Sequence, residues 1–355
     1  MDTGSTDETM VSLYYLNQVA ENLRAHQVSV KQWLGAENLK ESALYDSRCL
    51  VEFSTYCRLI ESAIQLSKLP HLGLIVGAQL SINHHGALGF ALLNCGTIRE
   101  MLAFFNRYLV TRTPLFKLQV VRGERATEVF LDSFVVTHEV LRPLTEVLIS
   151  TLVSTVQSVS SRVVNAAPNS VIYGSVVREI NFSYSRPDYF DKYQQLLNCR
   201  LKFARTRTSI LFSNDLVDKQ LRAVDQNSLL QAKQFCEQEL SLVSAHASWR
   251  SKVLMQIISR PDEYPDINII ASAMNVSART LHRNLCKEGT HFKKIVEQSL
   301  SSLAQQYLQE KSSTIKFVAY RLGYSDVANF RRAFKRWTGM TPQDYMQQPT
   351  TKGKN

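Results

Sequence analysis

The segment 323–342, near the end of the 355-residue chain, predicts a short helix with clear signals at both ends. Gly323 marks a turn, Ser325 and Asp326 carry side-chain oxygens that can cap a helix start, and Gly339 favours its end. The large apolar residues recur at i, i+3, i+4 and i+7 and predict one buried face: Phe330, Ala333, Phe334 and Trp337.

The same unit occurs once more, upstream, at an offset of 48 to 49 residues. In this first copy we expect a turn at Asn275, a cap at Ser277 and a helix end at Gly289, with Leu281 and Leu285 facing inward. Two copies of a helix, a tight turn and a second helix predict two similar structural units within the last hundred residues.

The outward faces of both expected second helices are cationic. Guanidinium groups match guanine edges and phosphates, so such a face can enter a DNA major groove. For one helix alone, a solvated basic surface is an equally good interpretation, and the second copy favours DNA binding. The outward residues are Arg279, His282 and Arg283 in the first unit and Ala328, Arg331, Arg332 and Lys335 in the second, with Asn329 and Arg336 on its flanks.

A connector between the copies also shows helical spacing, from Phe292 to Leu308, and we expect Thr290 to cap it. A helix of about 20 residues is roughly 30 Å long, close to the ~34 Å of one DNA turn. The connector is therefore long enough to present both cationic faces to successive major grooves.

Charge is distributed unevenly along the chain. The formal net charge is +10, and from residue 245 onward 17 Lys and Arg accompany only 8 Asp and Glu. Nearly all the excess positive charge thus lies in the last third, as phosphate binding requires. The length exceeds one ordinary domain and suggests two.

Several functional classes find no support in the sequence. There is no nucleophile elbow, phosphate-binding Gly-rich loop or zinc-protease motif, so we expect no enzyme activity and no cofactor. No apolar run reaches the ~18 residues of a membrane span, and the acidic start is no signal peptide. We therefore expect a cytoplasmic protein without a membrane partner.

The six cysteines predict reduced thiols, because they show neither a Cys-x-x-Cys pair nor a histidine at ligand spacing, and we expect no metal site. They are Cys49, Cys57, Cys95, Cys199, Cys236 and Cys286. His138 stands beside Glu139, with Glu146 two turns on, but no third partner is in view, so we interpret this as chance proximity.

The first two thirds of the chain alternate helical and strand-like patterns, which favours an α+β fold. Helices are expected within 11–68, from the Thr97 cap to Tyr108, and over 139–164 with Pro143 in the first turn. Strands are expected at 86–93, 116–121, 128–132, 177–184, 201–204 and 209–212. Arg186 is interpreted as a partner of a buried carboxylate rather than of an anionic effector, and Lys202, Arg205 and Arg207 have the same two interpretations.

The segment 225–248 is expected to link the two domains. Its apolar residues, among them Leu229, Ala232 and Leu240, predict an amphipathic helix, followed by a flexible joint over 241–248. The helix could dock on the first domain or pair with its twin in a homodimer, which we favour because a dimer doubles the DNA footprint. The resulting domains are 1–224, the linker 225–248, 249–347, and a disordered tail 348–355.

Residues from about 247 to 347 resemble the paired helix-turn-helix domain of the AraC/XylS family of bacterial transcription regulators. The resemblance rests on 275–285, 304–308, 318–326 and 330–342 with Tyr345. It departs from the family pattern at Leu300, where an arginine is usual, and at Met346, where a basic residue is usual. The resemblance implies groove-reading positions at Arg279, His282, Arg283, Ala328, Asn329 and Arg332.

The first region resembles the arabinose-binding-type sensor domain of ornithine-utilisation and virulence-type regulators, through 72–77, 86–90, 97–100 and 182–187 with Tyr193 and 201–203. This implies a small-molecule effector of unknown identity, and RNA polymerase as a partner. The sequence thus predicts an α+β sensor domain before an all-α domain with two helix-turn-helix units.

Taken together, the residues and the resemblance predict a sequence-specific DNA-binding regulator, and more specifically an activator. Arg279, Arg283 and Arg332 would read base edges, with His282 and Asn329 adding hydrogen bonds. Phosphates would be held by Ser277, Arg331, Lys335 and Arg336. The alternative is a nucleoid-type protein that binds nucleic acid without sequence preference.

Overall fold

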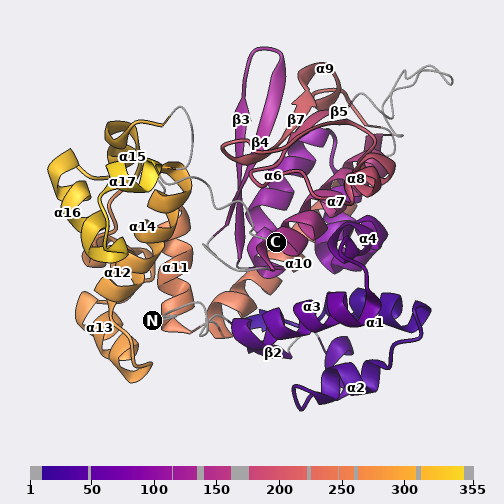
Figure 1. Ribbon diagram of the computed structural model, residues 1–355, viewed down its shortest axis with the longest axis horizontal. Helices are drawn as coiled ribbons and strands as arrows, with labels where there is room; N and C mark the ends of the chain where they lie inside the picture. The colour runs from indigo at the N-terminus through magenta and orange to yellow at the C-terminus, as the bar shows by residue number, and fades with distance from the viewer. Residues whose placement is uncertain are drawn as a thin grey trace. The chain divides into compact units, whose positions relative to one another are not determined.

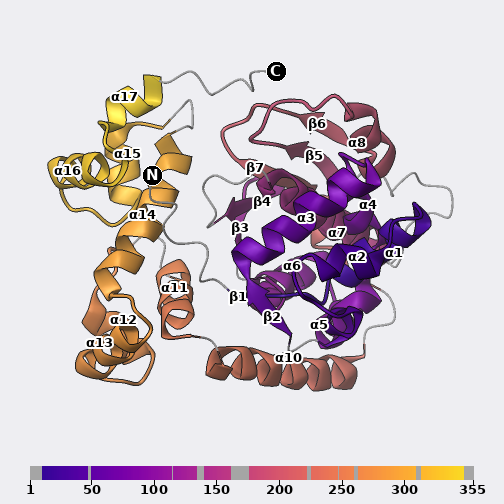
Figure 2. The same cartoon turned by 60° about the horizontal axis from the view of Figure 1, so that its bottom comes forward.

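The computed structural model describes residues 10–46, 49–113, 115–133, 140–160, 176–221, 225–246, 248–259, 263–308 and 313–347. They form two compact units, which divide between Ser241 and Leu242 inside one helix, α10 (Gln226–His246). Figures 1 and 2 show the elements from two directions. The predicted tail and His138 lie outside the described residues. The expected fold class, an α+β region followed by a helical one, is confirmed.

The first unit contains a five-stranded sheet with the order β3-β4-β7-β5-β6. Both β4 and β5 pair antiparallel with β7, whereas β6 pairs parallel with β5. Ile210 of β7 lies opposite Val129 and Ile180, and all three are buried, so this face belongs to the core. The strands are β3 (Phe116–Arg122), β4 (Ala126–Ser133), β5 (Val177–Asn181), β6 (Arg200–Lys202) and β7 (Thr208–Ser213).

The first unit also contains helices, and a two-stranded sheet pairs β1 (Met10–Ser12) with β2 (Leu50–Glu52). The strands predicted beyond residue 116 are confirmed with shifted ends, and so is the Thr97 cap, whose hydroxyl accepts from the Glu100 amide. The helices are α1 (Leu16–Ala25), α2 (Val30–Gly35), η1 (Glu41–Tyr45), α3 (Phe53–Ser67), α4 (Leu72–Gln79), η2 (Ile82–His85), α5 (Gly86–Asn94), α6 (Ile98–Tyr108), η3 (Leu109–Thr111), α7 (Leu141–Ser160), α8 (Phe190–Leu197) and α9 (Asn214–Val217).

Two glycines let α4 lie directly against α7. A Cβ on Gly73 would stand 2.4 Å from the Pro143 carbonyl oxygen, and one on Gly77 would stand 2.3 Å from that of Val147. The Thr151 hydroxyl donates to the Gly77 carbonyl at 3.2 Å across this contact. The helix pair therefore depends on residues without side chains.

The predicted strand at 86–93 is wrong, because these residues form α5. A short continuous apolar run does not distinguish a buried strand from a buried helix. In the fold, the helix packs closely against η2 at Gly89, where a Cβ would stand 1.8 Å from the Ile82 carbonyl oxygen.

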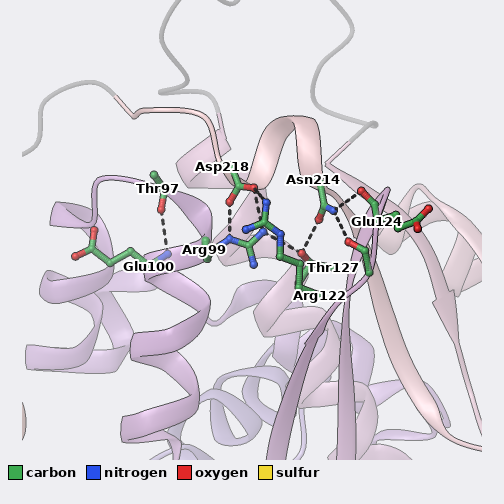
Figure 3. A network of polar contacts seen from close by, with 9 residues as sticks. Thr97, Arg99, Glu100, Arg122, Glu124, Thr127, Asn214 and Asp218 are labelled. Atoms are coloured by element: carbon green, nitrogen blue, oxygen red, sulfur yellow. Dashed lines mark hydrogen bonds and ion pairs between the residues drawn. The ribbon is translucent and has the colours of Figure 1, made fainter.

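Polar contacts join α6 to the β3–β4 hairpin and to α9, as Figure 3 shows. Arg99 pairs with Asp218, which also receives Arg122 at 3.1 Å. Arg99 donates in addition to the Thr127 hydroxyl at 3.2 Å, and Thr127 in turn donates to Asn214 at 2.6 Å. The hydrogen bond and charge of Arg99 lower the pKa of the Asp218 carboxyl despite partial desolvation.

Two of the charged residues that the sequence left open between two roles, Lys202 and Arg207, take structural ones. Lys202 pairs with Glu179 at 2.6 Å, and Arg207 pairs with the buried Asp132 at 2.6 Å. Arg186 is exposed, and its guanidinium carbon lies 3.7 Å from the ring centroid of Phe190. The expectation that Arg186 pairs a buried carboxylate is therefore wrong, because the neighbouring aromatic ring holds it at the surface.

Helix α10 is amphipathic, as predicted, and contacts α6 and η3. Tyr108 donates to Glu237 at 2.6 Å, and Arg112 donates to Glu239 at 2.6 Å. The expected flexible joint over 241–248 is wrong for its first part, because the helix continues to His246. The buried positions recur at helical spacing: Leu229, Ala232 and Cys236.

The second unit is helical and is built around one apolar cluster. Buried residues from six of its helices form the cluster, among them Val253, Leu281, Leu300, Phe330 and Phe334. In the parts of the chain that the structure describes, no helix has the length and apolar character of a bilayer span. The helices are α11 (Trp249–Ser259), α12 (Ile267–Ala273), α13 (Ala278–Lys287), α14 (Phe292–Leu308), α15 (Ile315–Arg321), α16 (Val327–Thr338) and α17 (Pro342–Gln347).

The connector helix α14 has 17 residues, about 25 Å at 1.5 Å per residue. The expected Thr290 cap is wrong. Thr290 is buried, and its hydroxyl has no hydrogen-bond partner among the described residues, so it does not cap the helix.

Candidate nucleic-acid interface

The second unit contains two helix-turn-helix units that repeat one another in backbone detail. Helices α12 and α13 are joined through Asn275, with φ of 55°, and α15 and α16 through Gly323, with φ of 77°. In the first turn the Val276 amide donates to the Ala271 carbonyl at 3.0 Å, and in the second Tyr324 donates to Ala319 at 2.9 Å. The predicted turns are confirmed, and each needs a residue that tolerates the left-handed conformation.

Side-chain caps fix where the second helix of each unit begins. The Ser277 hydroxyl accepts from the Thr280 amide at 3.1 Å, and the Asp326 carboxylate accepts from the Ala328 amide at 3.0 Å. Of the two oxygens expected at the second start, Asp326 provides this cap. The caps set the helix register and thereby which side chains face outward.

The face of α13 that packs inward is apolar, and the opposite face is cationic. Leu281 and Leu285 are fully buried, whereas Arg279, His282 and Arg283 are exposed. The burial expected for this helix is confirmed. All three outward side chains are accessible to a partner, and together with Cys286 and Lys287 they line one open cleft.

Helix α16 has the same division between its faces. Phe330 and Phe334 are fully buried. Among the residues predicted to read bases, Arg332 donates to the Asn329 side-chain oxygen at 2.6 Å, which holds the two side chains together. The predicted outward residues are all exposed: Ala328, Asn329, Arg331, Arg332, Lys335 and Arg336.

Two of the residues expected to hold phosphates already have partners within the chain. Arg336 donates to Glu297 of α14 at 2.6 Å, with 59% of its side chain exposed. The Ser277 oxygen serves as a cap and lies 2.9 Å from the Thr280 hydroxyl. Arg336 can therefore reach a phosphate only by sharing its guanidinium with Glu297, whereas Ser277 can donate its hydroxyl proton to a phosphate only when the Thr280 hydroxyl is the donor between the two.

The two cationic helices lie toward different ends of the connector. In both views α13 lies toward one end of α14 and α16 toward the other (Figures 1 and 2). The two helices together expose five arginines and two lysines, a cationic surface suited to an extended polyanion: Arg279, Arg283, Lys287, Arg331, Arg332, Lys335 and Arg336.

Two family models match the chain in regions that correspond to its two units. Residues 28–221, more than half of the chain, match the arabinose-binding domain of AraC transcription regulators. Residues 270–348 match a helix-turn-helix domain.

The chain belongs to the AraC family.

Relatives within the AraC family extend over most of the chain. The ornithine utilization regulator of Pseudomonas aeruginosa is 23% identical over 340 residues, which cover 96% of this chain and 97% of that protein. The regulator VirS of Mycobacterium tuberculosis is 23% identical over 293 residues, 82% of each chain. These relatives are transcription regulators and not enzymes, and the family supports DNA-binding transcription regulation.

Among solved structures, the transcriptional regulator CdpR of Pseudomonas aeruginosa matches 94% of this chain and 98% of its own. The sequence identity is 20% and the TM-score 0.43.

One family departure that the sequence shows now has a structural explanation. Leu300, where members of the AraC family usually have an arginine, is 3% exposed and belongs to the apolar cluster of the second unit. The substitution adds apolar burial on α14, and a cation at this position would be desolvated.

Sequence reasoning missed a feature of the α13 surface. Cys286 lies 3.7 Å from Nδ1 of His282 and 3.4 Å from Nδ1 of His291, so the expectation that no cysteine has a histidine at ligand spacing is wrong. The i, i+4 spacing of His282 and Cys286 on a helix was a visible signal. No comparable signal in the sequence marked His291, because its position depends on the turn through Gly289, with φ of 69°.

Proposed function

We propose that this chain is a sequence-specific transcription regulator that inserts α13 and α16 into successive major grooves and acts as an activator. One observation carries the proposal: two capped helices, toward different ends of one connector helix, expose different side chains. A protein that bound DNA through charge alone would need cationic surface, but not two distinct reading faces.

Base reading is assigned to exposed residues in the first two turns of each helix. Arg279 and Arg283 of α13 and Arg332 of α16 have guanidinium forks for guanine edges, and His282 and Asn329 add hydrogen bonds. Ala328 leaves room for close approach or for contact with a thymine methyl group. Ser277, Arg331, Lys335 and Arg336 hold phosphates and fix the register.

Control is assigned to the first unit, which binds a small-molecule effector. Ornithine is the first compound to test, because a regulator of ornithine utilization matches nearly the whole chain. A ligand at 100 times its dissociation constant stabilises the folded state by about 2.7 kcal/mol. We expect the effector to raise the unfolding midpoint of the first unit, and a compound that leaves it unchanged is not the effector.

The regulator acts as a homodimer in the cytoplasm and contacts RNA polymerase. Support for the dimer comes from α10, which exposes Leu230 by 57% and Phe235 by 58%. A second copy could cover these side chains. Sedimentation of the wild type and a Leu230→Glu, Phe235→Glu variant tests this: a monomer that retains its fold supports the dimer, and an unchanged mass refutes pairing through α10.

Competition among genomic fragments tests the proposed function. The purified chain is mixed with fragmented genomic DNA at physiological salt, and the retained fragments are sequenced. A few enriched fragments with a shared motif support sequence-specific regulation. Uniform retention supports the alternative, a nucleoid-type protein that binds without sequence preference.

A further inference from the structure

Three potential metal ligands lie together at the C-terminal part of α13. His282 and Cys286 stand one turn apart on the exposed face of the helix, and His291 follows the turn at Gly289. One ligand atom from each residue lies within 4.8 Å of the others, and the two histidine rings are stacked with centroids 6.0 Å apart. Three side chains of the types that bind transition metals thus converge on one point.

The distances match those of a tetrahedral zinc site. Zinc–sulfur bonds of 2.3 Å and zinc–nitrogen bonds of 2.0–2.1 Å place sulfur and nitrogen about 3.6 Å apart at tetrahedral angles. The Cys286 sulfur lies 3.7 Å from Nδ1 and 3.8 Å from Nε2 of His282, and 3.4 Å from Nδ1 of His291. The sulfur is almost equidistant from the two His282 nitrogens, so the His282 ring has to turn about its side-chain bonds before one nitrogen points at a shared ion.

We propose that His282, Cys286 and His291 form a Zn²⁺ site on the DNA-reading face of α13. Thiolate and imidazole are ligands that zinc favours, and three protein ligands leave a fourth position for water. The nearby carboxylate of Glu288 does not supply the fourth ligand, because its two oxygens accept the Trp249 and Arg250 amides at 2.7 and 3.0 Å.

The neighbouring charges limit how tightly the ion binds. Arg279, Arg283 and Lys287 line the same open cleft as His282 and Cys286, and they oppose the approach of a dication. The ligands are also exposed, so binding has to order their side chains. The site therefore binds more weakly than a buried four-ligand zinc site, as suits a reversible signal.

Zinc and DNA compete for His282. An imidazole nitrogen that binds zinc no longer contacts a base, and the ring is fixed toward Cys286 and His291 instead of the groove. Binding of either partner therefore weakens binding of the other by the same factor. This coupling rests on the proposed function, whereas the metal site itself does not.

Cobalt binding by the free protein tests the site without any DNA. The full chain, without a histidine tag and with its thiols reduced, is titrated with Co²⁺, whose thiolate charge-transfer absorption reports a bound sulfur. We expect one Co²⁺ per chain at this site, with displacement by Zn²⁺. The absorption is lost in Cys286→Ser and in His291→Ala.

Cys199→Ser is the matched control for this titration. Burial, with a smaller contribution from Glu179, raises the pKa of Cys199 to about 12, so this sulfur remains a thiol and the variant retains the Co²⁺ signal. Equal Co²⁺ spectra for the wild type and Cys286→Ser overturn the site.

The coupling to DNA is measured separately, on a fragment selected by the wild-type protein. We expect saturating Zn²⁺ to weaken wild-type binding about fivefold, the lower end of what a base contact contributes. His291→Ala binds the fragment as tightly as the wild type without zinc and does not respond to it. If zinc binds but leaves wild-type DNA affinity unchanged, the competition is refuted. If no fragment is selected, the proposed function fails while the cobalt result still stands.

Discussion

Replacing Glu146 by glutamine should remove the loss of stability that this carboxyl causes in the first unit as pH rises from about 4.5 to 7. Glu146 of α7 is fully buried. Its Oε1 accepts the hydroxyls of Tyr189 at 2.8 Å and Tyr193 at 2.5 Å, whereas Oε2 has no hydrogen-bond partner among the described residues. The carboxyl is therefore hydrogen-bonded on one oxygen and desolvated on both.

The magnitude follows from the pKa of this carboxyl. Burial raises the pKa of Glu146 from 4.5 to about 7, and the two tyrosines and Arg142 only partly oppose the shift. Between these values the folded state holds a proton that the unfolded state has released, so the free energy of unfolding falls as pH rises. A shift of this size corresponds to about 3 kcal/mol, lost by pH 8.

Glu146→Gln keeps the shape and an oxygen that can accept from both tyrosines, but it does not ionise. We expect the variant to gain about 2–3 kcal/mol of stability relative to the wild type between pH 5 and pH 8. Burial lowers the pKa of His85 to about 4, which gives both proteins the same slope of opposite sign, so this contribution cancels in the comparison. Urea titrations followed by the fluorescence of Trp33, which is buried in the first unit, measure this after the other two tryptophans are replaced by phenylalanine.

The exposed Glu124 in the β3–β4 turn provides the control, since Glu124→Gln should leave the wild-type pH dependence intact. One result would refute the reasoning: a difference in stability between Glu146→Gln and the wild type that is the same at pH 5 and at pH 8.

Two further predictions concern the second unit. Gly323→Ala should lower the free energy of unfolding by well over the ~1–2 kcal/mol of a left-handed alanine, because its Cβ would stand 2.0 Å from the Tyr264 amide nitrogen. Gly289→Ala should cost only that backbone strain, because no atom lies within 4 Å of its Cβ. Equal melting temperatures of the two variants would contradict this. Asp326→Ala should destabilise α16 by about 1 kcal/mol, because the side-chain cap on the Ala328 amide is lost, whereas Asp326→Asn should keep the cap. Hydrogen exchange of the α16 amides distinguishes the two variants. Faster exchange in both variants would argue against the cap.

Local signals in the sequence predicted the parts of the structure that depend on local chemistry. Asn275 and Gly323 marked both tight turns, and Thr97 marked the start of α6, because a left-handed residue or a capping oxygen acts within a few residues. The outward faces of α13 and α16 also followed, since amphipathic spacing and the buried Phe330 fix which side is exposed.

Features that depend on distant partners could not be predicted. Glu146 was interpreted as a chance neighbour of His138, because its tyrosine partners lie more than 40 residues away in sequence. The helix α5 was mistaken for a strand since Gly89 meets η2 only in the fold. His291 lies close to Cys286 only because the turn at Gly289 directs the chain back toward α13.

Selection of binding sites from a randomised DNA pool tests most directly whether α13 and α16 read separate base steps. Wild type, Arg283→Ala and Arg332→Ala are compared, with Lys335→Ala as a phosphate-contact control. We predict two conserved blocks about 10–10.5 bp apart in the wild-type motif. Each arginine variant should relax one block and lose about 1–3 kcal/mol on the wild-type site, and Lys335→Ala should weaken binding without changing the motif. Relaxation of the same block by both arginine variants, or an unchanged motif in either, would contradict two-helix reading.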